Sequence, residues 1–251
     1  MAFEYFQFPY GSDNYAVLVH DPASGATACV DAGDASAVLS ALESTGWTLS
    51  ELWITHHHGD HTAGLAEVKA ATGAKVLGPE GIAGVDQVLK GGDSFTFAGQ
   101  SVELLHTPGH TLDMLNFHIP SQAVVFTGDT LFVMGCGRVF EGTPDMMWES
   151  LQKLMALPPE TTIYCSHEYT AANAKFALSI DGSNAALQAR AAEITALRAK
   201  GEPTVPTRLS TELETNPFLR PMDPTIRQTL NMTAASDAEV FAEIRHRKDV
   251  F

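Results

Sequence analysis

The sequence Thr55-His56-His57-His58-Gly59-Asp60-His61 directly follows an apolar stretch, Leu52-Trp53-Ile54, and constrains the fold more than any other part of the chain. Four of its side chains, His56, His58, Asp60 and His61, are candidate metal ligands, and imidazole combined with carboxylate suits zinc, iron or manganese. Four ligands from one short loop cannot all reach one small ion without strain, so we expect two adjacent ions that share the loop. The alternative, a solvated histidine-rich turn, is disfavoured because the run is internal and follows a strand-like segment.

The composition describes an ordinary soluble globular protein. The chain has 251 residues, of which 45% are hydrophobic and 18% charged, and its formal net charge is −15. This charge argues against a nucleic-acid surface, although it permits a small anionic ligand in a local basic pocket. No apolar run approaches the ~20 residues that span a bilayer, and the N-terminus has no secretory pattern. Three cysteines indicate reduced thiols rather than a disulfide framework, so we expect a cytoplasmic protein without a membrane or nucleic-acid partner.

Short strand-like and helical segments alternate through the first two-thirds of the chain, and the last third is helical. The composition changes near residue 169, which predicts two domains, residues 1–168 and 169–251. We expect helices over 35–44, 62–71, 145–157, 171–180, 183–200 and 237–246. We expect strands over 15–19, 27–30, 49–55, 75–77, 94–97, 101–105, 114–119, 123–126 and 161–165.

Three downstream residues are candidates to complete the metal site. His110 lies in His106-Thr107-Pro108-Gly109-His110-Thr111, Asp129 in Phe126-Thr127-Gly128-Asp129-Thr130, and His167 in Tyr164-Cys165-Ser166-His167-Glu168-Tyr169. Each stands just after or between strand-like runs, where a rigid sheet can hold ligands together.

These motifs, in this order, resemble the metallo-β-lactamase superfamily and, within it, the glyoxalase II (hydroxyacylglutathione hydrolase) family. The superfamily pattern is T-H-x-H-x-D-H followed by a lone His, a lone Asp and a last His, and every element is present. The resemblance implies an α/β (α+β) protein, with a four-layer αββα sandwich that carries metals at one edge. A small all-helical C-terminal domain follows the sandwich.

The resemblance also implies the ligand set. His56, His58 and His110 would hold one divalent ion, Asp60, His61 and His167 a second, and Asp129 would bridge both. Zinc is the first expectation, with iron and manganese as alternatives. Asp60 and Asp129 would also act in catalysis. His57, between two ligands, should point away from them. Cys165 is interpreted as a buried structural thiol, and Cys136 is not expected to act as a nucleophile.

Substrate contacts are implied by three further motifs. Arg245-His246-Arg247-Lys248-Asp249-Val250-Phe251 contains the family's R-x-x-K-D-x-F ending, in which Arg245 and Lys248 would hold a glutathione carboxylate. The loop that starts at Gly135 resembles G-C-G-[RK]-x-[FY]-E-G-T and supplies Arg138 and Phe140, where some relatives have Tyr. Tyr169 matches a substrate-contacting tyrosine. The alternative for the C-terminal pair is a basic cluster that only complements a helix dipole.

The activity implied is hydrolysis of S-D-lactoylglutathione and related S-2-hydroxyacylglutathiones, which for the lactoyl substrate gives D-lactate and glutathione. A metal-bridging hydroxide would be the nucleophile, and the reaction would serve methylglyoxal detoxification. We expect the protein to be a monomer. The nearest alternatives are a single-iron persulfide dioxygenase and another thioesterase of the same superfamily. A β-lactamase would need an export signal and a nuclease a basic surface. A non-catalytic metal-binding protein would not need a bridging carboxylate such as Asp129.

Overall fold

The computed structural model describes residues 2–251, and its contacts divide the chain into two compact units. Of the described residues, unit 1 contains 2–106 together with 113–128, and unit 2 contains 107–112 and 129–251. The short loop 107–112, which carries His110, therefore belongs with unit 2. This grouping by contacts differs from the change in composition near residue 169, and the domain boundary there stays a prediction. Within residues 2–251, no helix combines the length and apolar character needed to cross a membrane.

The first sheet of unit 1 has the strand order β1-β2-β3-β4-β5-β6. The pairs β1–β2 and β2–β3 are antiparallel, whereas the pairs from β3 to β6 are parallel. Because β3 and β4 run parallel, their C-terminal ends meet at the same edge, and the histidine loop begins there. The strands are β1 (Glu4–Tyr10), β2 (Asn14–His20), β3 (Thr27–Val30), β4 (Leu49–Trp53), β5 (Lys75–Gly78) and β6 (Gln87–Val88).

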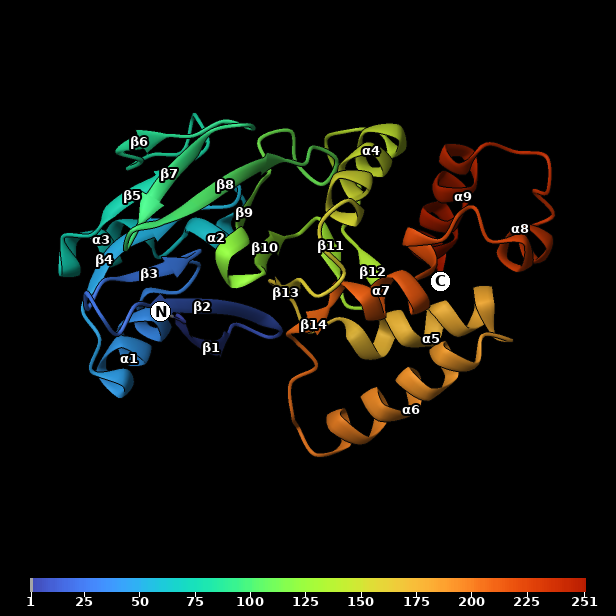
Figure 1. Ribbon diagram of the computed structural model, residues 1–251, viewed down its shortest axis with the longest axis horizontal. Coiled ribbons are helices and arrows are strands. Elements are labelled where there is room, and N and C mark those ends of the chain that lie inside the picture. Colours follow the sequence, from blue (N-terminus) through green and yellow to red (C-terminus); the bar gives the residue numbers. More distant parts are fainter. Residues whose placement is uncertain (1) are drawn as a thin grey trace. The chain divides into compact units, whose positions relative to one another are not determined.

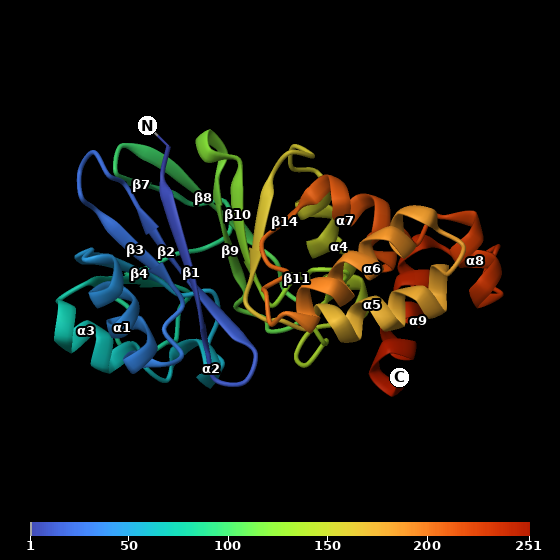
Figure 2. The ribbon, with the colours of Figure 1, turned by 90° about the horizontal axis from the view of Figure 1, so that it is seen from below.

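Helices α1 (Ala35–Thr45) and α3 (Leu65–Thr72) cover one face of this sheet, and the short α2 (Gly59–Thr62) lies in the histidine loop. Figure 2 shows α1 and α3 on one side of β2–β4. The Asp34 side chain caps α1 by accepting a hydrogen bond from the Ala37 amide, and the left-handed Gly46 ends it. The apolar stripe of α1 packs on the buried side chains of the strands in one hydrophobic core.

A second sheet of unit 1 packs on the opposite face. Its antiparallel strands β7 (Ser94–Phe97), β8 (Gln100–His106), β9 (Leu115–Ile119) and β10 (Val124–Gly128) are paired in chain order, and the 3-10 turn η1 (Pro120–Gln122) joins β9 to β10. The fully buried Trp53 of the first sheet forms the centre of the core between them. Its ring lies 5.1–5.5 Å from the rings of Phe95, Phe97 and Phe117. Aromatic packing thereby fixes the strand from which the histidine loop emerges.

Unit 2 is mainly helical. Helices α5 and α6 lie side by side in both views (Figures 1 and 2), as their contacts require. The sequence did not predict α7 or α8, and α9 continues beyond the expected end at His246. The elements are β11 (Leu131–Phe132), β12 (Gly135–Cys136), α4 (Pro144–Met155), β13 (Thr162–Cys165), α5 (Thr170–Asp181), α6 (Ala185–Ala199), β14 (Thr207–Arg208), α7 (Leu209–Thr215), η2 (Pro217–Leu219), α8 (Pro224–Leu230) and α9 (Asp237–Val250).

A buried carboxylate, Glu212 of α7, ties the β11–β12 turn to the helical part of unit 2. Its Oε2 accepts from the Met134 amide at 2.7 Å and from Asn216 Nδ2 at 3.1 Å, and its Oε1 accepts from Thr207 Oγ1 at 3.0 Å. Met134 has a φ of 56°, a left-handed conformation that costs energy in a non-glycine residue. Burial raises the pKa of Glu212 above its ordinary value of 4.5.

Glu212→Ala should lower the free energy of unfolding by several kcal/mol, because each buried donor left without an acceptor costs roughly 1–3 kcal/mol. Glu212→Gln keeps an acceptor and should cost less. Since the folded pKa is raised, the stability contributed by this carboxyl is fully present below pH 4.5 and is lost as the pH rises through the folded pKa. Urea unfolding of both variants between pH 4 and 8 tests this, and a steeper pH dependence in Glu212→Gln than in wild type would contradict it.

Candidate metal centre

The histidine loop leaves β4 through backbone hydrogen bonds that continue the sheet. The Ile54 amide bonds to the Leu77 carbonyl at 2.8 Å, so the chain stays extended until Thr55. The turn α2 then brings Asp60 and His61 back toward the strands. Hydrogen bonds hold both the backbone and the side chain of Asp60. Its backbone carbonyl accepts from the Tyr10 hydroxyl at 2.7 Å, and its Oδ2 accepts from Asn14 Nδ2 at 3.0 Å.

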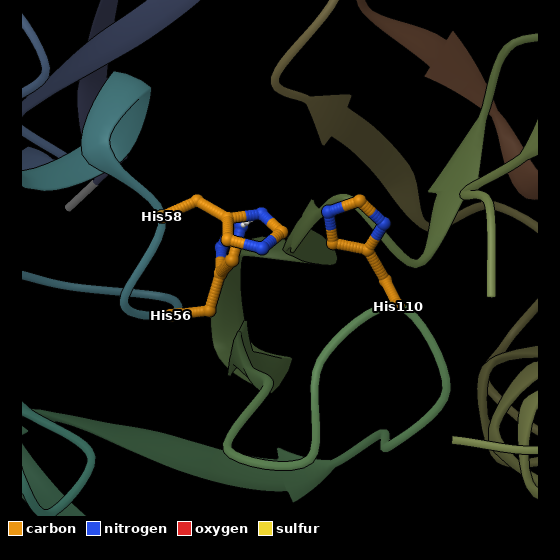
Figure 3. Close-up of side chains that lie close together, drawn as sticks. All are labelled: His56, His58 and His110. Carbon is orange, nitrogen blue, oxygen red and sulfur yellow. Dashed lines mark hydrogen bonds between the residues drawn. The ribbon is translucent and has the colours of Figure 1, made fainter. Parts of the chain in front are cut away.

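His56 and His58 lie against each other at the start of this loop (Figure 3). His56 Nε2 is 3.1 Å from His58 Nδ1, and the ring of His61 lies 4.1 Å from that of His56. His56 and His61 are fully buried, whereas His58 is half-buried and Asp60 is exposed. Unit 1 thus gathers all four ligands predicted from its loop, as their spacing in the sequence requires.

Asp31, directly after β3, orients two of the four, His61 directly and His56 through Thr55. Its Oδ1 accepts from the Thr55 amide at 2.8 Å, and its Oδ2 accepts from Thr55 Oγ1 at 2.9 Å and from His61 Nδ1 at 2.8 Å. The Thr55 hydroxyl donates its only proton to Asp31. Its oxygen therefore accepts a hydrogen bond from Nδ1–H of His56, 3.0 Å away. One buried carboxylate therefore sets the tautomers of two predicted ligands, with both Nε2 atoms presenting lone pairs.

The turn after Asp31 needs a glycine. A Cβ on Gly33 would lie 1.8 Å from the carbonyl oxygen of Asp60, so any side chain there would push the loop away. The same turn bonds to the loop on both sides, from the Ala32 amide to the His61 carbonyl and from the Gly64 amide to the Ala32 carbonyl. Close backbone approach therefore explains the glycine at position 33.

Unit 2 gathers the three remaining donors. His110 Nε2 and His167 Nε2 each lie 3.3 Å from the same oxygen, Asp129 Oδ2, and all three residues are at most 5% exposed. His110 is carried by the loop after β8 (Figure 3). Its Nδ1 donates to the Arg138 carbonyl at 2.9 Å, which leaves a lone pair on Nε2. Gly137 permits this packing, since a Cβ there would lie 1.9 Å from the Asp129 carbonyl oxygen.

The donor chemistry fits divalent metal ions. In neutral histidines whose Nδ1 is protonated, the Nε2 lone pair of His110 faces a carboxylate oxygen at 3.3 Å, and that of His61 faces Asp60 Oδ2 at 3.5 Å. Two electron-rich atoms at such distances repel unless a cation lies between them. Each of the seven predicted ligands belongs to a group of residues that could hold a metal ion.

His57, Cys136 and Cys165 could also bind a metal, but their surroundings do not favour this. His57 is bonded through Nδ1 to Asp113 at 3.0 Å and is exposed, which agrees with a side chain that points away from the ligands. Burial raises the pKa of the Cys165 thiol to about 12 and that of Cys136 to about 11, so neither is a thiolate near neutral pH. Both have the properties of structural thiols.

The predicted substrate contacts differ in their surroundings. The Tyr169 ring stacks on the His167 ring at 4.6 Å, and Phe140, 61% exposed, has its ring 5.1 Å from that of His110. Arg138 is exposed and Lys248 is half-buried. Arg245 is buried, where it donates to the Cys136 carbonyl at 2.9 Å.

Sequence reasoning missed the roles of Asp31 and Asn14. A signal for Asp31 is present: it directly follows β3, a buried strand, and β4, which leads to the histidine loop, is a parallel neighbour of β3. Residues at the C-terminal ends of adjacent parallel strands meet at one edge of the sheet. Asn14 has no comparable signal, because its reach to Asp60 depends on the turn between β1 and β2.

Two family models match the chain. The model of the metallo-beta-lactamase superfamily matches residues 11–85 and 79–167, and that of the hydroxyacylglutathione hydrolase C-terminus matches 168–251. A solved structure of ETHE1 from Myxococcus xanthus is similar over 98% of this chain and 90% of that one, with a TM-score of 0.70 and 25% identity. The chain is thus a member of the metallo-beta-lactamase superfamily, and the predicted fold class with its C-terminal helical domain is confirmed.

Curated relatives define the family further. The hydroxyacylglutathione hydrolase of Maricaulis maris is 51% identical over 98% of this chain and 97% of its own length. That of Brucella ovis is 53% identical over the same shares. A structure of TTHA1623 in a di-iron-bound form shares the fold, with a TM-score of 0.62 and 24% identity over 85% of this chain and 100% of that one. Within the superfamily, the chain belongs to the hydroxyacylglutathione hydrolases.

Asp31→Asn should weaken metal binding about 10- to 100-fold, because the amide places a donor where Thr55 and His61 both need an acceptor. Competition with a chromophoric chelator measures this without any assay of turnover. Asp34→Asn is the matched control, since asparagine caps a helix as well as aspartate does. Equal metal affinity in Asp31→Asn and Asp34→Asn would show that Asp31 does not orient the ligands.

Proposed function

We propose that this chain hydrolyses S-D-lactoylglutathione and related S-2-hydroxyacylglutathiones to the 2-hydroxy acid and glutathione. The observation that carries the proposal is the family's C-terminal region, residues 168–251, following a complete set of metal donors. The donors alone are compatible with hydrolysis of many substrates. The relatives that are 51–53% identical over nearly the whole chain are hydroxyacylglutathione hydrolases, which supports this substrate class.

We propose that these donors hold two divalent ions, with His56, His58 and His110 on one and Asp60, His61 and His167 on the other. Asp129 would bridge both. Its Oδ2 already lies 3.3 Å from His110 and from His167, one from each proposed ligand set, which supports this role. Zinc is the first candidate, and iron and manganese suit the same imidazoles and carboxylates.

Ions bound there would supply a water of lowered pKa and polarise the thioester carbonyl. The residues of the chain contribute position. Asp60, fixed by Asn14 and Tyr10, directs a carboxylate oxygen to the proton of the attacking water. Water would add its oxygen to the acyl carbon and release one proton, by way of Asp60, to solvent, while the carbon–sulfur bond breaks and its electron pair leaves with the sulfur. A thiol with a pKa of ~8.5 leaves as a tolerable anion, so the reaction needs no separate general acid.

Substrate binding would fall to Arg138, Tyr169, Arg245 and Lys248, with Phe140 beside them. The three cations offer a local attraction for the glutathione carboxylates in a chain whose net charge is −15. Phe140 has no hydroxyl, so any contact that a tyrosine makes there in relatives is replaced by apolar contact. Anchoring the tripeptide at a distance positions the thioester carbonyl and supplies the binding energy for reaction.

We further propose a cytoplasmic monomer. Its three cysteines are all free thiols, which suits a reducing compartment. All seven donors come from one chain, so the chemistry requires no partner subunit.

The purified enzyme should hydrolyse S-D-lactoylglutathione, seen as loss of thioester absorbance, and carry close to two metal ions per chain in the same sample. Asp129→Ala is the inactive control and should lose both metal and turnover, because it would remove the carboxylate proposed to serve both ions. A full metal complement without thioester hydrolysis would keep the fold and reject the substrate. One iron per chain with persulfide oxidation would identify the single-iron dioxygenase instead.

Lys248→Ala should raise KM for S-D-lactoylglutathione more than it lowers kcat, because the lysine binds substrate away from the reacting carbonyl. We expect roughly a tenfold rise in KM, as for loss of one charge-assisted contact. Lys200→Ala, which removes an exposed lysine after α6, is the control. If both variants keep the wild-type KM, the C-terminal anchor is misassigned.

A further inference from the structure

One carboxylate stands among the cations proposed to bind the substrate. Asp249 lies one turn after Arg245 on α9, and its Oδ1 is 2.9 Å from Arg245 Nη2. The same oxygen is 3.8 Å from Nε of Arg138, on the loop after β12. Two guanidinium groups therefore converge on one oxygen of a side chain that is 40% exposed.

Arg245 and Lys248 are both held in place by other contacts. Arg245 is fixed by the Cys136 carbonyl through Nη1 and by the Phe218 ring, 5.1 Å from its guanidinium carbon. Lys248 is held by the Ala172 carbonyl at 3.3 Å and lies over the rings of Phe176 and Phe251. The positive groups stay close together, and burial with the nearby Arg245 and Arg138 lowers the pKa of Lys248. The region has the charge excess that binds an anion, with one internal anion already in place.

We propose that Asp249 is an internal competitor for the ligand carboxylate, which occupies Arg245 and Arg138 in the free enzyme and sets the affinity for glutathione conjugates. The inference rests on the proposed function. A substrate or product carboxylate exchanges with Asp249 for the same guanidinium groups. Breaking the Asp249 ion pairs costs the same free energy whether substrate or released glutathione binds. Both ligands carry the same tripeptide carboxylates, and the acyl group takes no part in the exchange.

The competitor predicts a gain of affinity when its charge is removed. Asp249→Asn should lower both KM for S-D-lactoylglutathione and the inhibition constant of glutathione by a common factor of about two to five, the size expected for an exposed ion pair. Increasing salt should reduce this difference, since both competing interactions are ionic. Asp249→Glu keeps the charge and should resemble the wild type.

The control is Asp237→Asn, which removes a carboxylate from the first turn of the same helix, where it pairs with Arg227. Its KM should stay at the wild-type value. Calorimetric titration of glutathione into each variant gives the same comparison without turnover.

If Asp249→Asn leaves both constants unchanged or raises them, the carboxylate positions the cations and the proposal is overturned. That result differs from failure of the proposed function, in which the wild type itself neither hydrolyses the thioester nor binds glutathione. Tighter binding in Asp249→Asn alone, with Asp249→Glu and Asp237→Asn unchanged, supports the competitor.

Discussion

The buried carboxylate of Asp31 is the constraint on which the metal-binding loop depends. A charge in the core is costly unless it is fully paired, and Asp31 is 1% exposed while accepting bonds from Thr55 and His61. Its φ of 62° adds a backbone cost of about 1–3 kcal/mol, which persists only because surrounding structure enforces it. The hydrogen bonds that offset these costs fix one arrangement of the loop. In it, Nδ1 of His56 and Nδ1 of His61 are both bonded within the protein, and both Nε2 atoms are left to bind a metal.

In both units, an oxygen acceptor bonded to Nδ1 orients a predicted histidine ligand. In unit 1 the acceptor behind His61 is the Asp31 carboxylate, and in unit 2 the acceptor behind His110 is the Arg138 carbonyl. Each fixes the Nδ1 proton and leaves Nε2 to face a carboxylate. Each also needs a glycine nearby, Gly33 or Gly137, since a side chain would collide with a backbone carbonyl. Each unit thus orients its own ligands, through a side-chain carboxylate in unit 1 and through a backbone carbonyl in unit 2.

Sequence patterns predicted what depends on local periodicity. The strand over Thr27–Val30 has its predicted bounds, and α1 extends one residue past its predicted end. The ligand motif was recognisable because its residues are adjacent in the chain. The pattern failed at β1, Glu4–Tyr10, an edge strand that contains Pro9. The sequence pattern also predicted that α9 ends at His246, whereas the helix continues to Val250. Ion pairs between Arg247 and Glu243 and between Arg245 and Asp249 stabilise this last turn. No hydrophobic period marks that last turn.

The extension of α9 separates two residues that the sequence treats as equivalent. Arg245 and Lys248 are three positions apart, and spacing alone predicts one shared face with one shared role. In the structure Arg245 lies in the interior, where one guanidinium nitrogen donates to the Cys136 carbonyl and the other to Asp249. Lys248 is half-buried between aromatic rings, where partial desolvation strengthens its interaction with an anion. In a chain of net charge −15, long-range attraction for an anionic conjugate is absent. The proposed binding would then rest on this short-range cluster, with Arg245 and the neighbouring Asp249 carboxylate setting its strength.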